Sequence, residues 1–273
     1  MSDDRKARIK QDFIDARGYW SWGWDPLLDM APDYFAAYAK LSSVPWKPGS
    51  VLSPKVKELL YIAIDSSTTH MYEPGLRIHI RNALGYGATR DEIMEVMQLT
   101  SVLGVHTVTM GVPALLDAMR AAGQEMPASE LTPEQKRLKD EFIAARGYWS
   151  ETWDKVLTLS PDYFEAYTEF SSVPWKYGTL EPKIKEFVYI AIDSATTHLH
   201  ESGTRIHMAN ALKLGATPAE IMEVLALTAV LGVNTMAVGV PALLAELKRA
   251  SRKPSLSNAR RTSPRVKPTR RLA

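Results

Sequence analysis

Apolar residues recur along the chain every three or four positions, which places them on one face of an α-helix. Pro54 suits the first turn of a helix. The stripe after it predicts a helix over residues 54–70, with Val56, Leu59, Leu60 and Ala63 on one face. After a break at YEPG, a second stripe predicts a helix that ends at Gly85 and Gly87. That stripe consists of Leu76, His79, Ile80, Ala83 and Leu84.

A capping box predicts where the next helix begins. Thr89 is followed three residues later by Glu92, so the two residues can satisfy each other's backbone N–H groups at the start of RDEIMEVMQLTSVLG. Pro113 predicts the first turn of a closing helix, ALLDAMRAAG. No segment alternates apolar and polar residues between turn signals, so we expect no β-sheet. The predicted fold class is all-α.

The whole pattern occurs twice. Lys55–Leu116 reappears as Lys183–Leu244, and the aromatic-rich segment Ala16–Lys47 reappears as Ala145–Lys176. The 64 paired positions of 53–116 and 181–244 hold 42 identities. A repeat of this length is the size of a small domain and too long for a solenoid unit. We therefore expect two similar helical domains and two copies of any site.

Domain boundaries follow from the repeat and from composition. We place the first domain at 1–122, a polar linker at 123–132, the second domain at 133–249 and a basic tail at 250–273. Thr132 is expected to cap the first helix of the second domain. The tail holds eight Lys/Arg and no Asp/Glu, and its scarcity of apolar residues predicts disorder.

Charge and composition exclude several classes of protein. Without the tail, the body carries 25 basic and 31 acidic residues, which argues against a nucleic-acid-binding core; nucleic acid is expected only through the tail. The absence of cysteine excludes disulfides and thiol nucleophiles. No uninterrupted apolar run reaches about 18 residues, and the charged N-terminus lacks a secretion signal. We expect a cytoplasmic protein with no membrane partner.

Candidate acid–base residues lie on the two helices that flank YEPG. Glu58 and Asp65 share a face of the first helix with Tyr61. His79 interrupts the apolar stripe of the second helix, so its ring is predicted to point inward. A carboxylate beside an imidazole in a dry cleft orients the ring and tunes its pKa for acid–base catalysis. Asn82, on the same face as His79, is placed to hold a substrate oxygen. The second repeat supplies Glu186, Tyr189, Asp193, His207 and Asn210.

Other polar residues near this face have two interpretations each. His70 and His198 end the first helix of each pair and are candidates to line the cleft mouth, as are Glu73 and Glu201. Arg77 and Arg205 either pair with the glutamate four residues earlier or clamp a substrate carboxylate. Each inward histidine is either catalytic or a buried structural residue.

A metal site is a further alternative. His70, Glu73 and His79 form a conceivable ligand set, and the change from Tyr72 to His200 adds a ligand in the second repeat. No ligand-spacing motif supports such a site, so we predict no metal. No phosphate-binding loop or dinucleotide fingerprint is present, so no nucleotide cofactor is expected.

The segment KVKELLYIAI…GLRIHIRNALGYGATRDEIMEVM…GVPALL and its copy resemble the carboxymuconolactone decarboxylase family. This all-helical fold is shared with the alkylhydroperoxidase AhpD, and the resemblance covers most of both halves. It implies two tandem AhpD-like domains packed as an intramolecular pseudo-dimer. It also implies a homo-oligomer, in which three two-domain chains mimic the hexameric ring of the family.

The resemblance also assigns site residues. The AhpD branch carries a Cys-x-x-Cys-x-x-x-His site with an upstream glutamate; the histidine falls on His79 and His207, and the glutamate on Glu58 and Glu186. The cysteine positions hold Tyr72 and Gly75, and then His200 and Gly203. Thiol peroxidase activity is therefore excluded, because no sulfur nucleophile exists. The cysteine-free branch decarboxylates a small unsaturated lactone acid without a cofactor.

These inferences predict a cofactor-independent enzyme that acts on a small carboxylate- or lactone-bearing compound. In it His79 and His207 move the proton, Glu58 and Glu186 orient them, and Arg77 with Arg205, or His70 with His198, anchor the carboxylate. One alternative is a non-catalytic ligand-binding or scaffold protein of the same fold. Another is an accessory factor that binds nucleic acid or an acidic partner through the tail.

Overall fold

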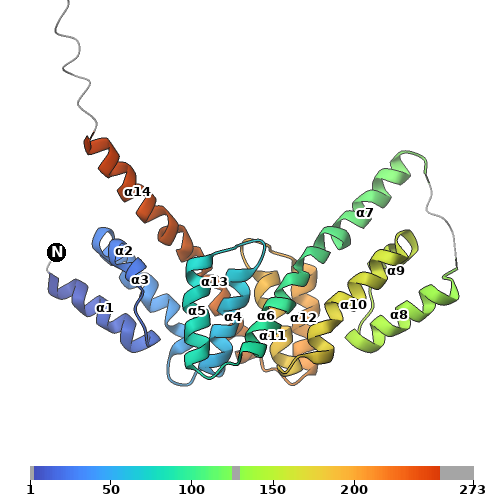
Figure 1. Cartoon of the computed structure of the whole chain (residues 1–273), viewed down its shortest axis with the longest axis horizontal. Coiled ribbons are helices and arrows are strands. Elements are labelled where there is room, and N and C mark those ends of the chain that lie inside the picture. The colour runs from blue at the N-terminus through green and yellow to red at the C-terminus, as the bar shows by residue number, and fades with distance from the viewer. Residues whose placement is uncertain (1–2, 125–129, 253–273) are drawn as a thin grey trace, which may run out of the picture.

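The computed structural model describes residues 3–124 and 130–252 as helices joined by short turns, with no strand in those two segments (Figure 1). The predicted all-α fold is confirmed. The first repeat forms α1 (Asp3–Arg17), α2 (Asp25–Met30), α3 (Pro32–Ser42), α4 (Pro54–Ser66), α5 (Glu73–Gly85), α6 (Arg90–Ser101) and α7 (Val105–Ala121). The second forms α8 (Pro133–Arg146), α9 (Glu151–Leu159), α10 (Pro161–Tyr177), α11 (Pro182–Ser194), α12 (Glu201–Lys213), α13 (Pro218–Ala229) and α14 (Asn234–Arg252).

Local chemistry places the starts of α4, α6, α8 and α13 where the sequence predicts them, but α4 ends at Ser66 instead of His70, and α5 begins at Glu73, inside the predicted break at YEPG. Thr89 and Glu92 form the predicted capping box of α6, and Thr217 with Glu220 does the same for α13. Thr132 caps α8, with Gln135 as its partner. Residues 250–252, which we had assigned to the tail, continue α14. The remaining tail residues 253–273, and residues 125–129 of the predicted linker, lie outside the described residues.

The predicted start of the closing helices was wrong. Pro113 lies inside α7, which begins at Val105, and Pro241 lies inside α14. A proline removes only one hydrogen bond of the helix ladder. In α7 the turns before it are held in helical form by Val105, Val108 and Val112, which pack against the aromatic cluster of the second repeat.

Helices α4 and α11 form the centre of the molecule. Their apolar residues share one core, in which Leu60 and Ile62 of α4 and Phe187 and Ile190 of α11 are fully buried. Helices α5 and α6 pack on α4, and α12 and α13 pack on α11 in the matching way. The two repeats thus form an intramolecular pseudo-dimer with a continuous core.

The closing helix of each repeat packs against the opposite repeat. In Figure 1, α7 leaves the centre as an arm beside α8–α10, and α14 leaves it beside α1–α3. Val105 of α7 belongs to the cluster built on Phe142 and Phe164, whereas Val240 of α14 belongs to the cluster built on Phe13 and Phe35. The aromatic segment that opens each repeat therefore contributes a core cluster, and Tyr19, Trp20 and Trp24 of the first repeat also line a cavity.

Two buried ion pairs also join the repeats. Glu95 of α6 accepts hydrogen bonds from the backbone N–H groups of Thr179 and Leu180, at 2.6 and 2.9 Å, and pairs with Lys185 at 2.8 Å. Glu223 of α13 bonds the N–H groups before α4 and pairs with Lys57 in the same way. Each side chain of the two pairs is less than 9% exposed, so water screens them little.

Two continuous stretches, Arg90–Ala121 and Pro218–Ser251, are long and apolar enough to cross a membrane by length and composition alone. Core helices of soluble proteins meet the same criterion, and the first half of each stretch here, α6 or α13, belongs to the shared core. The cytoplasmic location stays a prediction.

We expect Glu95→Ala to lower the free energy of unfolding by about 3–5 kcal/mol, because it leaves the buried ammonium of Lys185 without its partner. Denaturant titration followed by circular dichroism measures this loss. Glu201→Ala, which breaks the exposed pair with Arg205, is the control and is expected to cost less than about 1 kcal/mol. Equal losses in both variants would contradict the assigned role of Glu95.

Candidate active site

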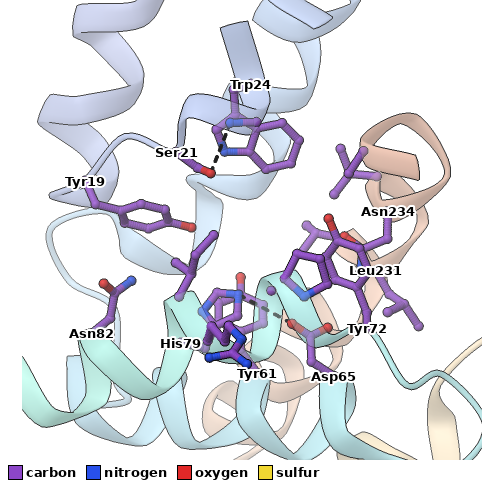
Figure 2. Close-up of a pocket in the computed structure, with 18 of the residues that line it drawn as sticks. Tyr19, Ser21, Trp24, Tyr61, Asp65, Tyr72, His79, Asn82, Leu231 and Asn234 are labelled. Atoms are coloured by element: carbon purple, nitrogen blue, oxygen red, sulfur yellow. Dashed lines mark hydrogen bonds and ion pairs between the residues drawn. The ribbon is translucent and has the colours of Figure 1, made fainter. Parts of the chain in front are cut away.

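Each predicted site lies in a cavity that both repeats enclose. In the first repeat, a cavity of about 570 Å³ lies between α4, α5 and the segment Arg17–Trp24, and residues of η4 (Val230–Val233) and α14 close it (Figure 2). The second cavity, of about 260 Å³, lies between α11 and α12, and His106 and Met110 of α7 line it. We call these the first and second clefts.

Glu58 bonds His79 as the sequence predicts; His79 lines the first cleft, and Glu58 lies behind it. The Glu58 side chain is fully buried, and its Oε2 lies 2.6 Å from Nδ1 of His79. Because a carboxylate accepts hydrogen bonds, Nδ1 carries the proton, which leaves Nε2 as the free position of the ring. Asn82 donates to the other oxygen of Glu58 at 3.3 Å. Asn82 therefore helps to hold the glutamate and also lines the cleft.

Tyr61 and Asp65 complete the surroundings of this imidazole. The Tyr61 ring stacks on that of His79 with 4.4 Å between centroids. Asp65 Oδ2 lies 3.9 Å from His79 Nε2, so the ring stands between two carboxylates. Burial raises the pKa of Asp65 to about 6, although the nearby His79 charge opposes the change. Asp65 can thus hold or release a proton near neutral pH.

Gly75, which stands where the AhpD branch has a cysteine, has a packing role. A Cβ added to Gly75 would lie 2.1 Å from Asp65 Oδ2. In the second cleft, a Cβ on Gly203 would approach Asp193 Oδ2 equally closely. The aspartate therefore occupies the space that a side chain at this position would need.

The second cleft repeats the same geometry. His207 Nδ1 lies 2.6 Å from Glu186 Oε2, Asn210 donates to Glu186 at 3.3 Å, and Asp193 Oδ2 lies 3.9 Å from His207 Nε2. Tyr189 stacks on His207 at 4.5 Å. Burial raises the pKa of Asp193 to about 7. Both repeats therefore carry a Glu–His–Asp arrangement.

The remaining predicted residues lie farther from these rings. His70 contacts Asn234 at 2.8 Å and Asp65 at 3.6 Å but does not line the first cleft. Arg77 pairs with Glu73 and Arg205 with Glu201, and both arginine side chains are about three-quarters exposed. Of the two, Arg77 lines its cleft. The structure therefore favours the interpretation in which Arg205 forms an ion pair with Glu201 on the same helix.

His198 differs from its counterpart His70. Its Nε2 lies 2.6 Å from Nδ1 of His106, whose ring stacks on His200 at 3.6 Å between centroids. Burial, together with the neighbouring imidazoles, lowers the pKa of His106 to about 3. The sequence shows the change from Tyr72 to His200, and it places Asn234 in the second repeat where the first has His106. Sequence reasoning did not bring these residues together, because α7 crosses to the other repeat.

Arg17 and its counterpart Arg146 are functional candidates that sequence reasoning missed. Arg17 is buried, lines the first cleft and lies over the Trp46 ring at 4.8 Å. Burial alone would lower its pKa, but the neighbouring tyrosines and Glu58 raise it overall, so the guanidinium stays charged. The sequence feature that could have indicated Arg17 is the ARGYW segment, which occurs in both repeats.

Comparison with known proteins agrees with this architecture. The model of the carboxymuconolactone decarboxylase family matches residues 32–124 and 161–248. The chain belongs to this family. A search of curated proteins found no match.

Among solved structures, one similar chain comes from Burkholderia xenovorans LB400 and is provisionally named as a gamma-carboxymuconolactone decarboxylase subunit. It shares 42% sequence identity with a TM-score of 0.85, over 90% of this chain and 98% of that one. The likeness thus extends over both repeats and the helices that enclose the two clefts.

We expect Asp65→Asn to stabilise the protein more at pH 8 than at pH 5. The raised pKa of Asp65 contributes stability below its ordinary value of 3.8, and this contribution is lost as the pH rises through about 6. Because asparagine does not titrate, the variant has no such loss. The difference in free energy of unfolding between the variant and the wild type therefore grows in the variant's favour by roughly 1 kcal/mol between pH 5 and 8. Urea unfolding at the two pH values measures the change. The exposed Asp117→Asn is the control, and a constant difference for Asp65→Asn would count against the buried carboxylate.

Proposed function

We propose that this protein is a cofactor-independent, carboxymuconolactone decarboxylase-like enzyme that acts on a small carboxylate- or lactone-bearing compound. The observation that carries the proposal is the Glu–His pair, which occurs in both clefts at 2.6 Å with the second ring nitrogen left free. Family membership and the name of the Burkholderia structure support the same class of reaction. The absence of cysteine excludes the thiol chemistry of the peroxidase branch.

The geometry suits the protonation that must follow loss of CO₂. When the carbon–carboxylate bond breaks, its electron pair passes into an adjacent carbonyl or alkene system. A proton must then be delivered to carbon from a group beside the substrate. His79 Nε2 can supply it, because Glu58 holds the opposite nitrogen and stabilises the positively charged ring. Asp65, with its pKa of about 6, can return a proton to the ring.

Arg17 is our preferred anchor for the substrate carboxylate in the first cleft, with Arg146 in the second. Each guanidinium is largely buried and lines its cleft. The Nε of each has no hydrogen-bond partner in the structure. A planar carboxylate fits such a fork. Arg77 is the alternative anchor, but it is exposed and already paired with Glu73.

We also propose that three chains assemble into a ring. Large apolar side chains are exposed along the two arms, including Met110 and Leu115 on α7 and Val238, Leu243 and Leu247 on α14. Exposed apolar surface of this kind is common at subunit interfaces. Light scattering coupled to size-exclusion chromatography gives the mass, and a monomer at micromolar concentration would end this proposal.

We expect His79→Gln combined with His207→Gln to lower kcat on an identified lactone acid by at least about 100-fold, because the proton donor is lost in both clefts. Release of CO₂ by the purified protein measures turnover. Glutamine keeps the polarity and approximate size of histidine, and circular dichroism verifies the fold. Full turnover by the double variant would refute the catalytic role. Binding of the acid by the wild type without any product would favour the ligand-binding alternative.

We expect Arg17→Lys combined with Arg146→Lys to raise KM by about tenfold with a smaller effect on kcat, because lysine keeps the charge but not the two-pronged contact. Steady-state kinetics on the same acid measures both constants. The control is Arg77→Gln combined with Arg205→Gln, which is expected to leave KM nearly unchanged. The opposite result would make the exposed arginines the anchor.

A further inference from the structure

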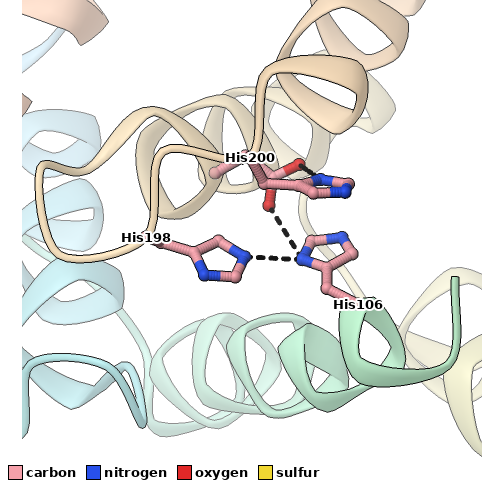
Figure 3. A group of neighbouring side chains, drawn as sticks. His106, His198 and His200 are labelled. Carbon is pink, nitrogen blue, oxygen red and sulfur yellow. Dashed lines mark hydrogen bonds and ion pairs between the residues drawn. The ribbon is translucent and has the colours of Figure 1, made fainter. Parts of the chain in front are cut away.

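A cluster of metal-ligating side chains lies at the second cleft, next to the Glu186–His207 pair: His106, His200 and Asp193 line the cleft, and His198 stands behind them. Asp193 lies at the end of α11, and His198 and His200 lie in the turn that follows. His106 comes from α7 of the other repeat, and Figure 3 shows the three imidazoles gathered around one point. One ligand atom from each of the four residues lies within 4.8 Å of the others.

From this arrangement we propose that the second cleft binds one divalent metal ion, with zinc as the best fit, through His106, His198, His200 and Asp193. A tetrahedral ion with bonds of about 2.0–2.1 Å holds its ligand atoms about 3.3 Å apart. Here His106 Nδ1 lies 2.6 Å from His198 Nε2 and 3.8 Å from Asp193 Oδ1. His200 Nδ1 lies 3.7 Å from Asp193 Oδ2. The 2.6 Å contact is a hydrogen bond between two imidazoles, and the two carboxylate distances involve different oxygens of Asp193, so an ion binds here only after the His106 and His198 nitrogens separate by about 0.7 Å.

The cluster also leaves a polar atom unsatisfied. Asp193 is 1% exposed, and its Oδ2 has no hydrogen-bond donor in the structure. A buried carboxylate oxygen without a donor carries a desolvation cost that a bound cation removes. His198 and His200 flank Leu199, whose φ of +51° lies in the left-handed region.

Ligand chemistry selects the class of ion. Three imidazole nitrogens and one carboxylate oxygen suit zinc and the late first-row metals, whereas magnesium and calcium prefer oxygen ligands. In the structure His200 Nδ1 accepts the backbone N–H of Gly203 at 3.2 Å, so an ion on this nitrogen replaces that helix-cap bond, and the Nε2–H then donates to Ser202 Oγ, 3.2 Å away. Such outer contacts orient a metal-binding imidazole.

The first cleft provides an internal comparison. It has the same turn, with Met71 at φ +51°, and it keeps Asp65 and His70 at the matching positions. Tyr72 replaces His200, however, and Asn234 replaces His106. The shared scaffold therefore does not require the two extra histidines. Because the first cleft lacks both, we expect one ion per chain.

The test is a zinc titration of the full chain, purified without a polyhistidine tag and stripped with a chelator. Isothermal titration calorimetry should show one zinc ion per chain, and Co²⁺ should give the visible bands of a tetrahedral nitrogen–oxygen site. Zinc should also raise the Tm. Absence of stoichiometric binding, or two equal ions per wild-type chain, would overturn the proposal.

The repeat supplies matched variants. His106→Asn combined with His200→Tyr installs the residues of the first cleft and should weaken zinc binding by at least about 100-fold, since even outer-shell losses cost 10–100-fold. His70→Gln, at the matching position of the first repeat, should leave one ion per chain. Conversely, Tyr72→His combined with Asn234→His should create a second site. Unchanged binding in the His106/His200 variant, with its helical circular dichroism intact, would assign the ion elsewhere.

This proposal does not depend on the proposed decarboxylase function. Zinc binding is measured without a substrate, and it involves neither His79 nor Glu58. Failure of the zinc titration would leave the Glu58–His79 chemistry untouched. Conversely, an inactive protein could still bind one ion per chain.

Discussion

Packing of α4 on α11 is the constraint on which the rest of the structure depends. These helices bury nearly all their residues after the first turn, including Lys57, Glu58 and Asp65 on the first and their counterparts on the second. Buried charges need partners. Lys57 finds one in Glu223 of the opposite repeat, and Glu58 finds one in His79 of the adjacent helix. The same burial that stabilises the pseudo-dimer therefore places the acid–base residues.

The closing helices make each cleft a product of both repeats. Asn234 and Val238 of α14 line the first cleft, whereas His106 and Met110 of α7 line the second. A substrate in either cleft contacts both halves of the chain. Domain boundaries drawn from the repeat assign α7 to the first domain and α14 to the second. Each of these helices packs against the opposite repeat, so the boundaries separate residues that line the same cleft.

Much of the fold was predictable from the sequence because local chemistry dictates it. The capping boxes at Thr89 and Thr217 and the apolar stripe of α4 act within a few residues, so the sequence shows them directly. The Glu58–His79 contact was also foreseeable, since both residues lie on inward faces of neighbouring helices. The course of α7 through Pro113 was not, because it depends on packing against Phe142 and Phe164. The burial of Arg17 and the meeting of His106 with His200 likewise require long-range contacts.

Joining both halves in one polypeptide changes what evolution can do with the clefts. In a dimer of identical subunits every substitution appears at both sites, so a change that spoils one spoils the other. Here position 72 carries tyrosine while position 200 carries histidine, and position 234 carries asparagine while position 106 carries histidine. Gene fusion thus permits a division of labour: one cavity can preserve an ancestral task while its twin acquires a different one.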